Sequence, residues 1–155
     1  MSEVAARRTT GEDPDAQRLV AAMTAETGAL YGGPPPEGSS ATPGELSPPE
    51  GGFVVLERDG VAVAGGGLKR SGPGICEIKR MYVMPEARGA GLGARLLVEL
   101  ETLARELGYA VARLDTGAKQ PGAQRLYERA GYRSIADFNG DAHAAWWGEK
   151  PLSPS

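Results

Sequence analysis

A run of glycines behind an arginine is the part of this chain whose residue types most clearly suggest chemistry. The segment reads Arg88-Gly89-Ala90-Gly91-Leu92-Gly93 and lies between an extended segment and a leucine-rich one. Glycines let a backbone turn tightly and approach a ligand, and the first N–H groups of a helix have no partners within the helix. The order strand, glycine turn, helix therefore favours a phosphate or pyrophosphate, to which Arg88 would add a charge-assisted hydrogen bond.

The same glycines allow a second interpretation. Residues 89–94 also fit the dinucleotide fingerprint G-x-G-x-x-G/A, and Asp115 lies about 20 residues further on, where that fingerprint has an acidic residue. In the fingerprint, however, the glycines follow the strand directly, whereas here residues 84–88 intervene. The chain after Asp115 is also too short for the further units of a dinucleotide fold. A P-loop is excluded because no Gly-Lys-Ser/Thr follows the glycines.

A helix is expected directly after the glycine turn. Leucines recur there at intervals of three or four residues, which predicts one buried stripe. These leucines are Leu92, Leu96, Leu100, Leu103 and Leu107. Charged side chains fill the positions between them, and we expect those side chains to face solvent. They are Glu99, Glu101, Arg105 and Glu106. Gly108 is expected to end the helix.

The remaining pattern predicts a sheet around that helix. Strands are expected at 4–10, 53–56, 61–64, 77–83, 109–114, 132–138 and 144–147, and further helices at 13–30 and 122–129. Asp59-Gly60 between apolar runs is a hairpin signal, and Asp13-Pro14 is typical of a helix start. The helix between strands 77–83 and 109–114 makes that pair parallel. The glycines at 65–67 indicate a bulge, a close ligand or a poorly ordered turn.

Composition limits the kinds of partner. Residues 1–155 are expected to form one domain, with a loop rich in Pro, Gly and Ser at 32–52. Because 17 basic residues stand against 20 acidic ones, nothing favours nucleic acid or an anionic membrane. The single Cys76 excludes an internal disulfide framework. The N-terminus has no long apolar run, so we expect a cytoplasmic protein without a membrane span.

Three blocks of the sequence together resemble the GNAT N-acetyltransferases. Residues 88–93 match the signature R/Q-x-x-G-x-G/A, which holds the pyrophosphate of acetyl-CoA in that family. The strand Glu-Ile-Lys-Arg-Met-Tyr-Val precedes it, and Leu-Tyr-Glu-Arg-Ala-Gly-Tyr at 126–132 follows. The resemblance covers roughly residues 52–133. It implies the GNAT acyltransferase fold, an α/β fold with a mixed, mostly antiparallel sheet of about six to seven strands, flanked by helices and splayed between its central parallel strands.

The resemblance also implies which residues bind acetyl-CoA. The backbone of Met81, Tyr82 and Val83 would pair with pantetheine like an added strand. Gln120 stands where the family usually has an Asn that binds pantetheine, and its longer side chain leaves this contact plausible but not assured. The full set expected to bind the cofactor is Met81, Tyr82, Val83, Arg88, Gly89, Ala90, Gly91, Leu92, Gly93, Ala94 and Gln120.

Two side chains are candidates for acid–base catalysis. Glu77 occupies the strand position where the family often has a general base, which would take a proton from an acceptor ammonium of pKa about 10.4. The alternative for Glu77 is an ion pair with Lys79 or Arg70 at the surface. Tyr127 lies where the family commonly has the acid for the leaving thiolate. Its alternative is an aromatic that packs a short helix on the sheet.

Other residues give weaker signals. Asp115 orients an acceptor amine or only ends its strand. Cys76 is more typical of a small hydrophobic side chain than of a nucleophile, and the single His143 excludes a site built from several histidines, so no metal is expected. Trp146 and Trp147 face opposite sides of a strand. One should be core, and the other would wall the acceptor pocket or a subunit contact, which leaves a homodimer open.

These observations lead to one function and one rival. We expect an N-acetyltransferase that transfers the acetyl group of acetyl-CoA to a primary amine of a small molecule, by direct attack in a ternary complex. If loop 32–52 lines the acceptor site, Glu37, Glu45 and Glu50 would favour a cationic amine. The other interpretation of the loop is a mobile surface segment. The rival function is a non-catalytic acyl-CoA-binding or regulatory module.

Overall fold

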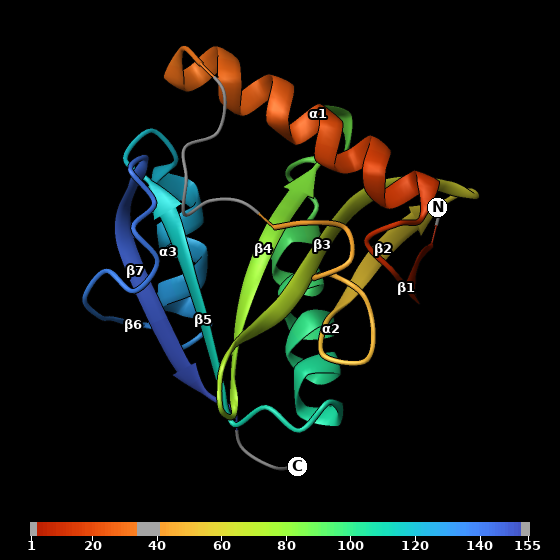
Figure 1. Cartoon of the computed structure of the whole chain (residues 1–155). Helices are drawn as coiled ribbons and strands as arrows, with labels where there is room; N and C mark the ends of the chain where they lie inside the picture. Colours follow the sequence, from red (N-terminus) through yellow and green to blue (C-terminus); the bar gives the residue numbers. More distant parts are fainter. Residues whose placement is uncertain (1–2, 34–40, 153–155) are drawn as a thin grey trace.

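The fold is one seven-stranded sheet with helices on both faces (Figure 1). The computed structural model describes residues 3–33 and 41–152. The strands are β1 (Val4–Thr9), β2 (Gly52–Arg58), β3 (Val61–Gly72), β4 (Ile75–Val83), β5 (Val111–Gly117), β6 (Arg133–Ser134) and β7 (Ala144–Pro151). The helices are α1 (Pro14–Tyr31), α2 (Leu92–Glu106), α3 (Pro121–Arg129) and the short 3-10 helix η1 (Pro85–Ala87). This is the mixed α/β architecture that the sequence predicts.

The strand order is β1-β2-β3-β4-β5-β7-β6. All neighbours run antiparallel except β4 and β5, which are parallel as predicted. Their pairing is short, because Ile75–Glu77 pair with Val111–Arg113 and no further β4–β5 pair follows. Beyond Glu77 the two strands separate, while β5 keeps its pairing with β7 as far as Gly117. The predicted splay between the central parallel strands is therefore present.

A bulge in β4 lies just beyond the last β4–β5 pair. Gly65 pairs with Tyr82 and Gly67 with Lys79, so Gly66 alone faces two residues of β4. The extra residue is Arg80, which has a φ of 62°, a left-handed conformation that is uncommon for a residue other than glycine. Such bulges bend a strand and change the direction of its side chains. The bulge that the three glycines indicate is thus in place.

The sheet separates two apolar cores. One lies between the sheet and α2 with α3, and its members include Leu96, Leu100 and Tyr127. The other lies between the sheet and α1, and it is built from Leu19, Phe53 and their neighbours. The bulge glycines fit between these layers. A Cβ on Gly66 would lie 2.9 Å from Met81 Cγ and 3.2 Å from Met81 Cα.

Local signals place most elements, but two expectations are wrong. Residues 132–138 form no continuous strand, because only Arg133–Ser134 pair with β7. Glu101 does not face solvent but is buried, with Lys150 Nζ at 2.9 Å and a hydrogen bond from the Tyr132 hydroxyl. Beyond β7, Leu152 is buried in the core.

The contact between Gly66 and Met81 gives a stability prediction. Gly66→Ala should lower the free energy of unfolding by about 1–3 kcal/mol, because the added methyl group overpacks the site against Met81 and Leu100. Urea unfolding measures this change. Gly44→Ala is the control, because a Cβ there meets nothing within 4 Å, and it should stay within about 0.5 kcal/mol of wild type. Equal effects of both substitutions would contradict the packing assigned to the bulge.

Candidate active site

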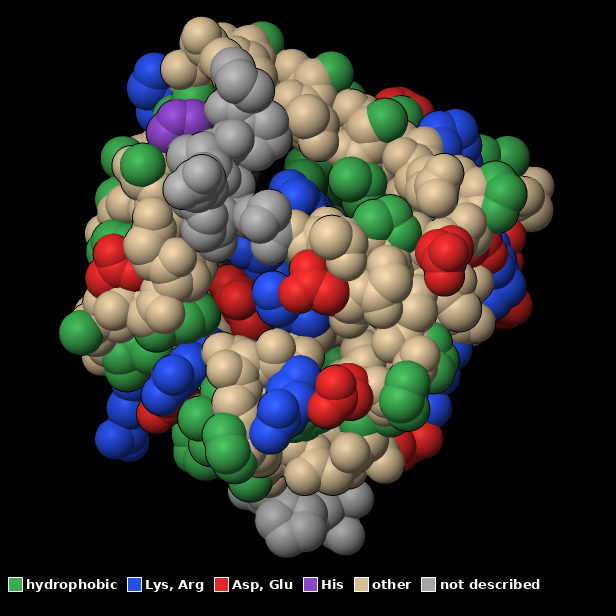
Figure 2. Space-filling model, in the orientation of Figure 1, with side chains coloured by type: hydrophobic (Ala, Val, Ile, Leu, Met, Phe, Trp, Pro, Cys, Tyr) green, Lys and Arg blue, Asp and Glu red, His purple; other side chains and the backbone are tan. Residues whose placement is uncertain are grey.

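A pocket of about 190 Å³ opens where β4 and β5 separate. Its wall is formed by α1, the ends of β4 and β5, the start of α3 and the segment before β7. The lining residues are Met23, Thr24, Glu26, Thr27, Tyr31, Ile78, Lys79, Arg80, Met81, Tyr82, Asp115, Thr116, Gly117, Gln120, Ala123, Tyr127, Asp141, His143 and Ala144. Figure 2 shows basic and acidic side chains gathered side by side on this face of the molecule.

The glycine turn between β4 and α2 has the geometry of an anion cradle. Gly89 and Gly91 have φ values of 87° and 76°, and Gly91 is the N-cap of α2. A Cβ at either glycine would meet nothing within 4 Å, so the turn faces open space. The first N–H groups of α2, from Leu92 onward, lack partners within the helix. The turn therefore fits a pyrophosphate, which is the part of acetyl-CoA that the sequence predicts here.

Arg88 lies at the mouth of this turn but already has partners. Its Nη2 atom is 2.8 Å from Oε1 of Glu26 on α1, and its Nε donates to the carbonyl of Val83 at 2.9 Å. The guanidinium also lies over the ring of Tyr82, whose hydroxyl donates to Glu26 at 3.0 Å. An incoming phosphate would have to compete with the Glu26 carboxylate for Arg88.

Tyr127 is the predicted acid, and its side chain is buried at the pocket wall. Its hydroxyl lies 4.0 Å from the sulfur of Met81, which is only a weak hydrogen bond. Burial, followed by the negative charge of Asp115, raises the pKa of Tyr127 to about 12. The phenol therefore keeps its proton at any physiological pH and can donate a hydrogen bond.

Glu77 is the predicted base, and its side chain is buried. Its Oε2 atom lies 3.3 Å from Lys79 Nζ and accepts a hydrogen bond from Asn139 Nδ2 at 2.9 Å. Lys79 is the partner that the alternative interpretation named, although the pair is inside the protein and not at the surface. Among the described residues that line the pocket, Asp115 is present and Glu77 is not.

Asn139 joins Glu77 to Asp115. Its Nδ2 donates to Oδ2 of Asp115 at 2.6 Å as well as to Glu77, and its Oδ1 accepts from Trp147 Nε1 at 3.1 Å. Burial raises the pKa of Asp115 to about 6, against the lowering effects of Asn139 and Lys79. The site thus holds a carboxylate that changes charge near neutral pH. Trp147 supports this cluster while Trp146 packs in the core, so the two rings face opposite sides as expected.

Tyr31 contacts two other residues that line the pocket. Tyr31, the last residue of α1, stacks on His143 with ring centroids 4.5 Å apart. Its hydroxyl lies 3.5 Å from Oε1 of Gln120. Gln120 caps α3 and lines the pocket beside Met81 and Tyr127, so it remains available for its predicted role in binding pantetheine.

Sequence reasoning missed Asn139, Tyr31 and Arg80 as site residues. Asn139 lies in a connection that the sequence marks only as a turn, and no local signal places it between two strands. Tyr31 comes at the end of a weakly patterned helix. Arg80 belongs to the quoted strand motif, but its left-handed backbone arises from pairing with β3. The three glycines at 65–67, with the charged Arg80 on the neighbouring strand, were the signal that could have indicated this bulge.

Other candidates lie away from the pocket. Cys76 is fully buried, and burial raises the pKa of its thiol to about 12. Glu45 pairs with Lys69 and Glu50 with Arg70, and neither lines the pocket. Glu37 lies outside the described residues. Within residues 3–33 and 41–152, no cluster of His, Cys, Asp and Glu could hold a metal ion, and no helix is long and apolar enough to cross a membrane.

Known proteins resemble this chain over most of its length. An uncharacterized N-acetyltransferase of Escherichia coli is 33% identical over 144 residues, which are 86% of this chain and 84% of that protein. An IAA acetyltransferase of Azospirillum brasilense is 36% identical over 110 residues, covering 69% of this chain and 72% of that protein. A crystal structure from Klebsiella pneumoniae, described as a proposed acyl-CoA N-acyltransferase, superimposes with a TM-score of 0.78 at 30% identity and covers 99% of both chains.

The fold, the glycine turn and these likenesses agree with one family. The sequence profile described as "Acetyltransferase (GNAT) family" matches residues 19–132. That span contains the glycine turn, the β4 bulge and Tyr127. The chain therefore belongs to the GNAT family of acetyltransferases.

Proposed function

We propose that this protein transfers the acetyl group of acetyl-CoA to a primary amine of a small molecule, by direct attack in a ternary complex. The observation that carries the proposal is the opening between β4 and β5. A phenol and a carboxylate, Tyr127 and Asp115, line the same pocket there, and the glycine turn follows β4 in the chain. Membership of the GNAT family supports the acyl transfer, and the description of the Klebsiella pneumoniae protein supports a CoA thioester as donor.

Acetyl-CoA would bring the acetyl group on a thioester sulfur: a new N–C bond forms, the C–S bond breaks, the amine loses a proton and the thiolate gains one. The turn at 89–94 would hold the pyrophosphate through backbone N–H groups and the positive end of the α2 dipole. The β4 backbone at Met81–Val83 lies beyond the last pairing with β5. It would therefore pair with an extended ligand in the manner of an added strand, with Gln120 opposite.

The carboxylates would remove the proton from the acceptor amine. We assign the direct contact to Asp115, because it lines the pocket and is a base above pH 6. Glu77 remains the predicted base of the β4 strand. In this proposal it acts through Asn139, whose amide donates to both carboxylates and keeps their negative charges close together. The negative charge of Glu77 adds to the rise in the pKa of Asp115, of which burial is the largest cause.

Tyr127 would serve the other side of the reaction. A departing thiolate has a pKa near that of cysteine, about 8.5, which is far below the pKa of about 12 held by this phenol. The phenol is therefore protonated when the thiolate forms, and it can donate a hydrogen bond that stabilises the charge on sulfur. Because the thiolate is a weaker base than the phenolate, transfer of the proton itself would be uphill. The Tyr127 hydroxyl is near the β4 backbone, because it contacts the side-chain sulfur of Met81.

The rival function, a non-catalytic acyl-CoA-binding module, makes a different use of the same turn. It needs the glycine cradle but not the carboxylates or the phenol. Catalysis is favoured because a buried phenol, Tyr127, and a half-buried carboxyl group, Asp115, line the opening, where a module that only binds would more cheaply carry apolar residues. Turnover separates the two functions.

Removal of the phenol hydroxyl tests catalysis. Wild type should release free thiol from acetyl-CoA only when a suitable amine is present, and Tyr127→Phe should lower kcat about 100-fold or more while acetyl-CoA affinity, measured by calorimetry, is unchanged. Tyr109→Phe is the control, since that hydroxyl bonds the backbone of Glu50 away from the pocket, and it should turn over normally. No thiol release from wild type with any amine, despite acetyl-CoA binding, would favour the binding module.

The carboxyl group predicts a pH dependence. A base works in its charged form, so kcat/KM should rise with pH through about 6 as Asp115 loses its proton. Asp115→Asn should abolish this limb and lower kcat/KM about 100-fold or more. Asp59→Asn, at the β2–β3 turn, should leave the pH profile unchanged. A limb near pH 6 that survives in Asp115→Asn would refute the assignment.

The Arg88–Glu26 ion pair predicts opposite effects on cofactor affinity. Arg88→Gln should raise the dissociation constant for acetyl-CoA about tenfold or more, because a charged hydrogen bond is worth about 1.5–3 kcal/mol. Glu26→Gln should instead lower the dissociation constant, because Arg88 would no longer have to break an ion pair with a carboxylate before it binds a phosphate. Calorimetry measures both. Weaker binding in Glu26→Gln would show that the ion pair helps to form the site.

A further inference from the structure

Arg80 is half-buried, and the described protein does not neutralise its positive charge. Its Nε atom is the one buried side-chain nitrogen or oxygen in the described residues without a hydrogen-bond partner. No ion pair within 4.0 Å involves Arg80 among these residues. Burial lowers the pKa of the guanidinium, and the more distant charge of Asp141 only partly offsets this. Buried charges are normally paired, so this arginine requires an explanation.

Elsewhere the same fold pairs its buried charges. Glu77 has Lys79 at 3.3 Å and Asn139 at 2.9 Å. Glu101, buried under α2, has Lys150 at 2.9 Å and the Tyr132 hydroxyl at 2.8 Å. Arg80 thus differs from Glu77 and Glu101, whose charges are paired within the protein.

The backbone at this position gives a second indication. Arg80 is the bulged residue of β4, with a φ of 62°, and a glycine or asparagine would adopt that conformation at lower cost. The bulge therefore does not need an arginine side chain. An arginine that adopts strained backbone in order to line a pocket is best explained by what its guanidinium binds.

The pocket places this cation within reach of the acceptor side. Arg80 lines the same pocket as Met23, Thr24 and Thr27 of α1, whereas no residue of the glycine turn at 89–94 lines it. The phosphates of CoA are thus expected elsewhere. Asp115 lies on the other side of the opening, on β5. The pocket therefore presents a cation on β4 and a carboxyl group on β5.

We propose that the acceptor is an amino carboxylic acid, whose carboxylate is bound by Arg80 while its amine meets Asp115. This inference rests on the proposed acetyl transfer and names its substrate class. The planar fork of a guanidinium matches the two oxygens of a carboxylate. The carboxylate would supply the charge that Arg80 lacks. Lys79 is held by Glu77, so Arg80 is the residue that selects the anion.

Matched acceptors test this proposal. Each amino acid of a panel is compared with its own carboxamide, which keeps the amine and the side chain but loses the negative charge. Wild type should acetylate at least one acid with a kcat/KM at least tenfold above that of its amide. Arg80→Gln should remove this preference by lowering kcat/KM for the acid, and Arg80→Lys should keep part of it. Acetyl-CoA affinity should not change in either variant.

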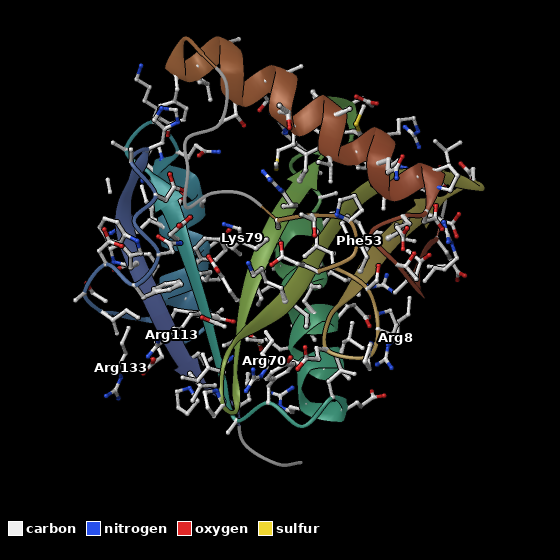
Figure 3. All side chains as sticks on the ribbon, viewed as in Figure 1. Arg8, Phe53, Arg70, Lys79, Arg113 and Arg133 are labelled. Carbon is white, nitrogen blue, oxygen red and sulfur yellow. The ribbon has the colours of Figure 1, made fainter. Side chains whose placement is uncertain are left out.

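Arg133→Gln is the control for the loss of a positive charge. Arg133 lies on β6 at the edge of the sheet, exposed and away from the pocket (Figure 3), so this variant should keep the wild-type preference. Thermal melts show whether each variant is folded. Arg80→Lys keeps the test meaningful if Arg80→Gln does not fold.

A binding measurement separates this inference from the proposed function. Calorimetry of the CoA-saturated protein with the same acids and amides requires no turnover. Arg80-dependent binding of an acid without thiol release would support the carboxylate site at Arg80 and contradict the acetyl transfer. Thiol release with uncharged or amide acceptors, unaffected by Arg80→Gln, would support the transfer and overturn the inference. If no acid is bound and no acid is acetylated, the inference is overturned as well.

Discussion

The parting of β4 from β5 is the constraint on which the rest of the site depends. Parallel pairing stops at Glu77 and Arg113, and the bulge at Arg80 then bends β4 over Gly66 of β3. Because β5 continues on β7 as far as Gly117, the opening stays between two well-supported strands. The space that this leaves is lined by backbone and by side chains of both strands. A regular, fully paired sheet from the same residues would have no room for a ligand at its centre.

The bulge also explains why three consecutive glycines lie in the middle of a strand. A side chain at Gly65 would meet Leu19 and Phe53 on the α1 side, whereas one at Gly66 would meet Met81 and Leu100 on the α2 side. The glycines therefore let both helical layers approach β3 closely. This close packing holds Met81 against Tyr127 and leaves Arg80 in its left-handed conformation. The same packing therefore shapes the core, the opening and the positions of the proposed catalytic groups.

Sequence reasoning succeeded where the signal is local. The Asp13-Pro14 helix start, the Asp59-Gly60 turn and the leucine stripe of α2 each depend on a few neighbouring residues, and each has the expected structure. It failed where distant parts of the chain decide the outcome. Glu101 looks like a surface residue until Lys150 and Tyr132 reach it. Asn139 acquires its role only when the chain folds it between Glu77 and Asp115. The pocket was predicted by resemblance, but its charge pattern required the three-dimensional fold.

A crystal structure of the protein with acetyl-CoA would show whether the β4–β5 opening is the site of acyl transfer. We expect the pyrophosphate on the N–H groups of the 89–94 turn, the pantetheine arm along β4 beyond Glu77, and the thioester sulfur within hydrogen-bonding distance of the Tyr127 hydroxyl. A cofactor bound outside the β4–β5 opening, or a thioester turned away from both Tyr127 and Asp115, would contradict this expectation.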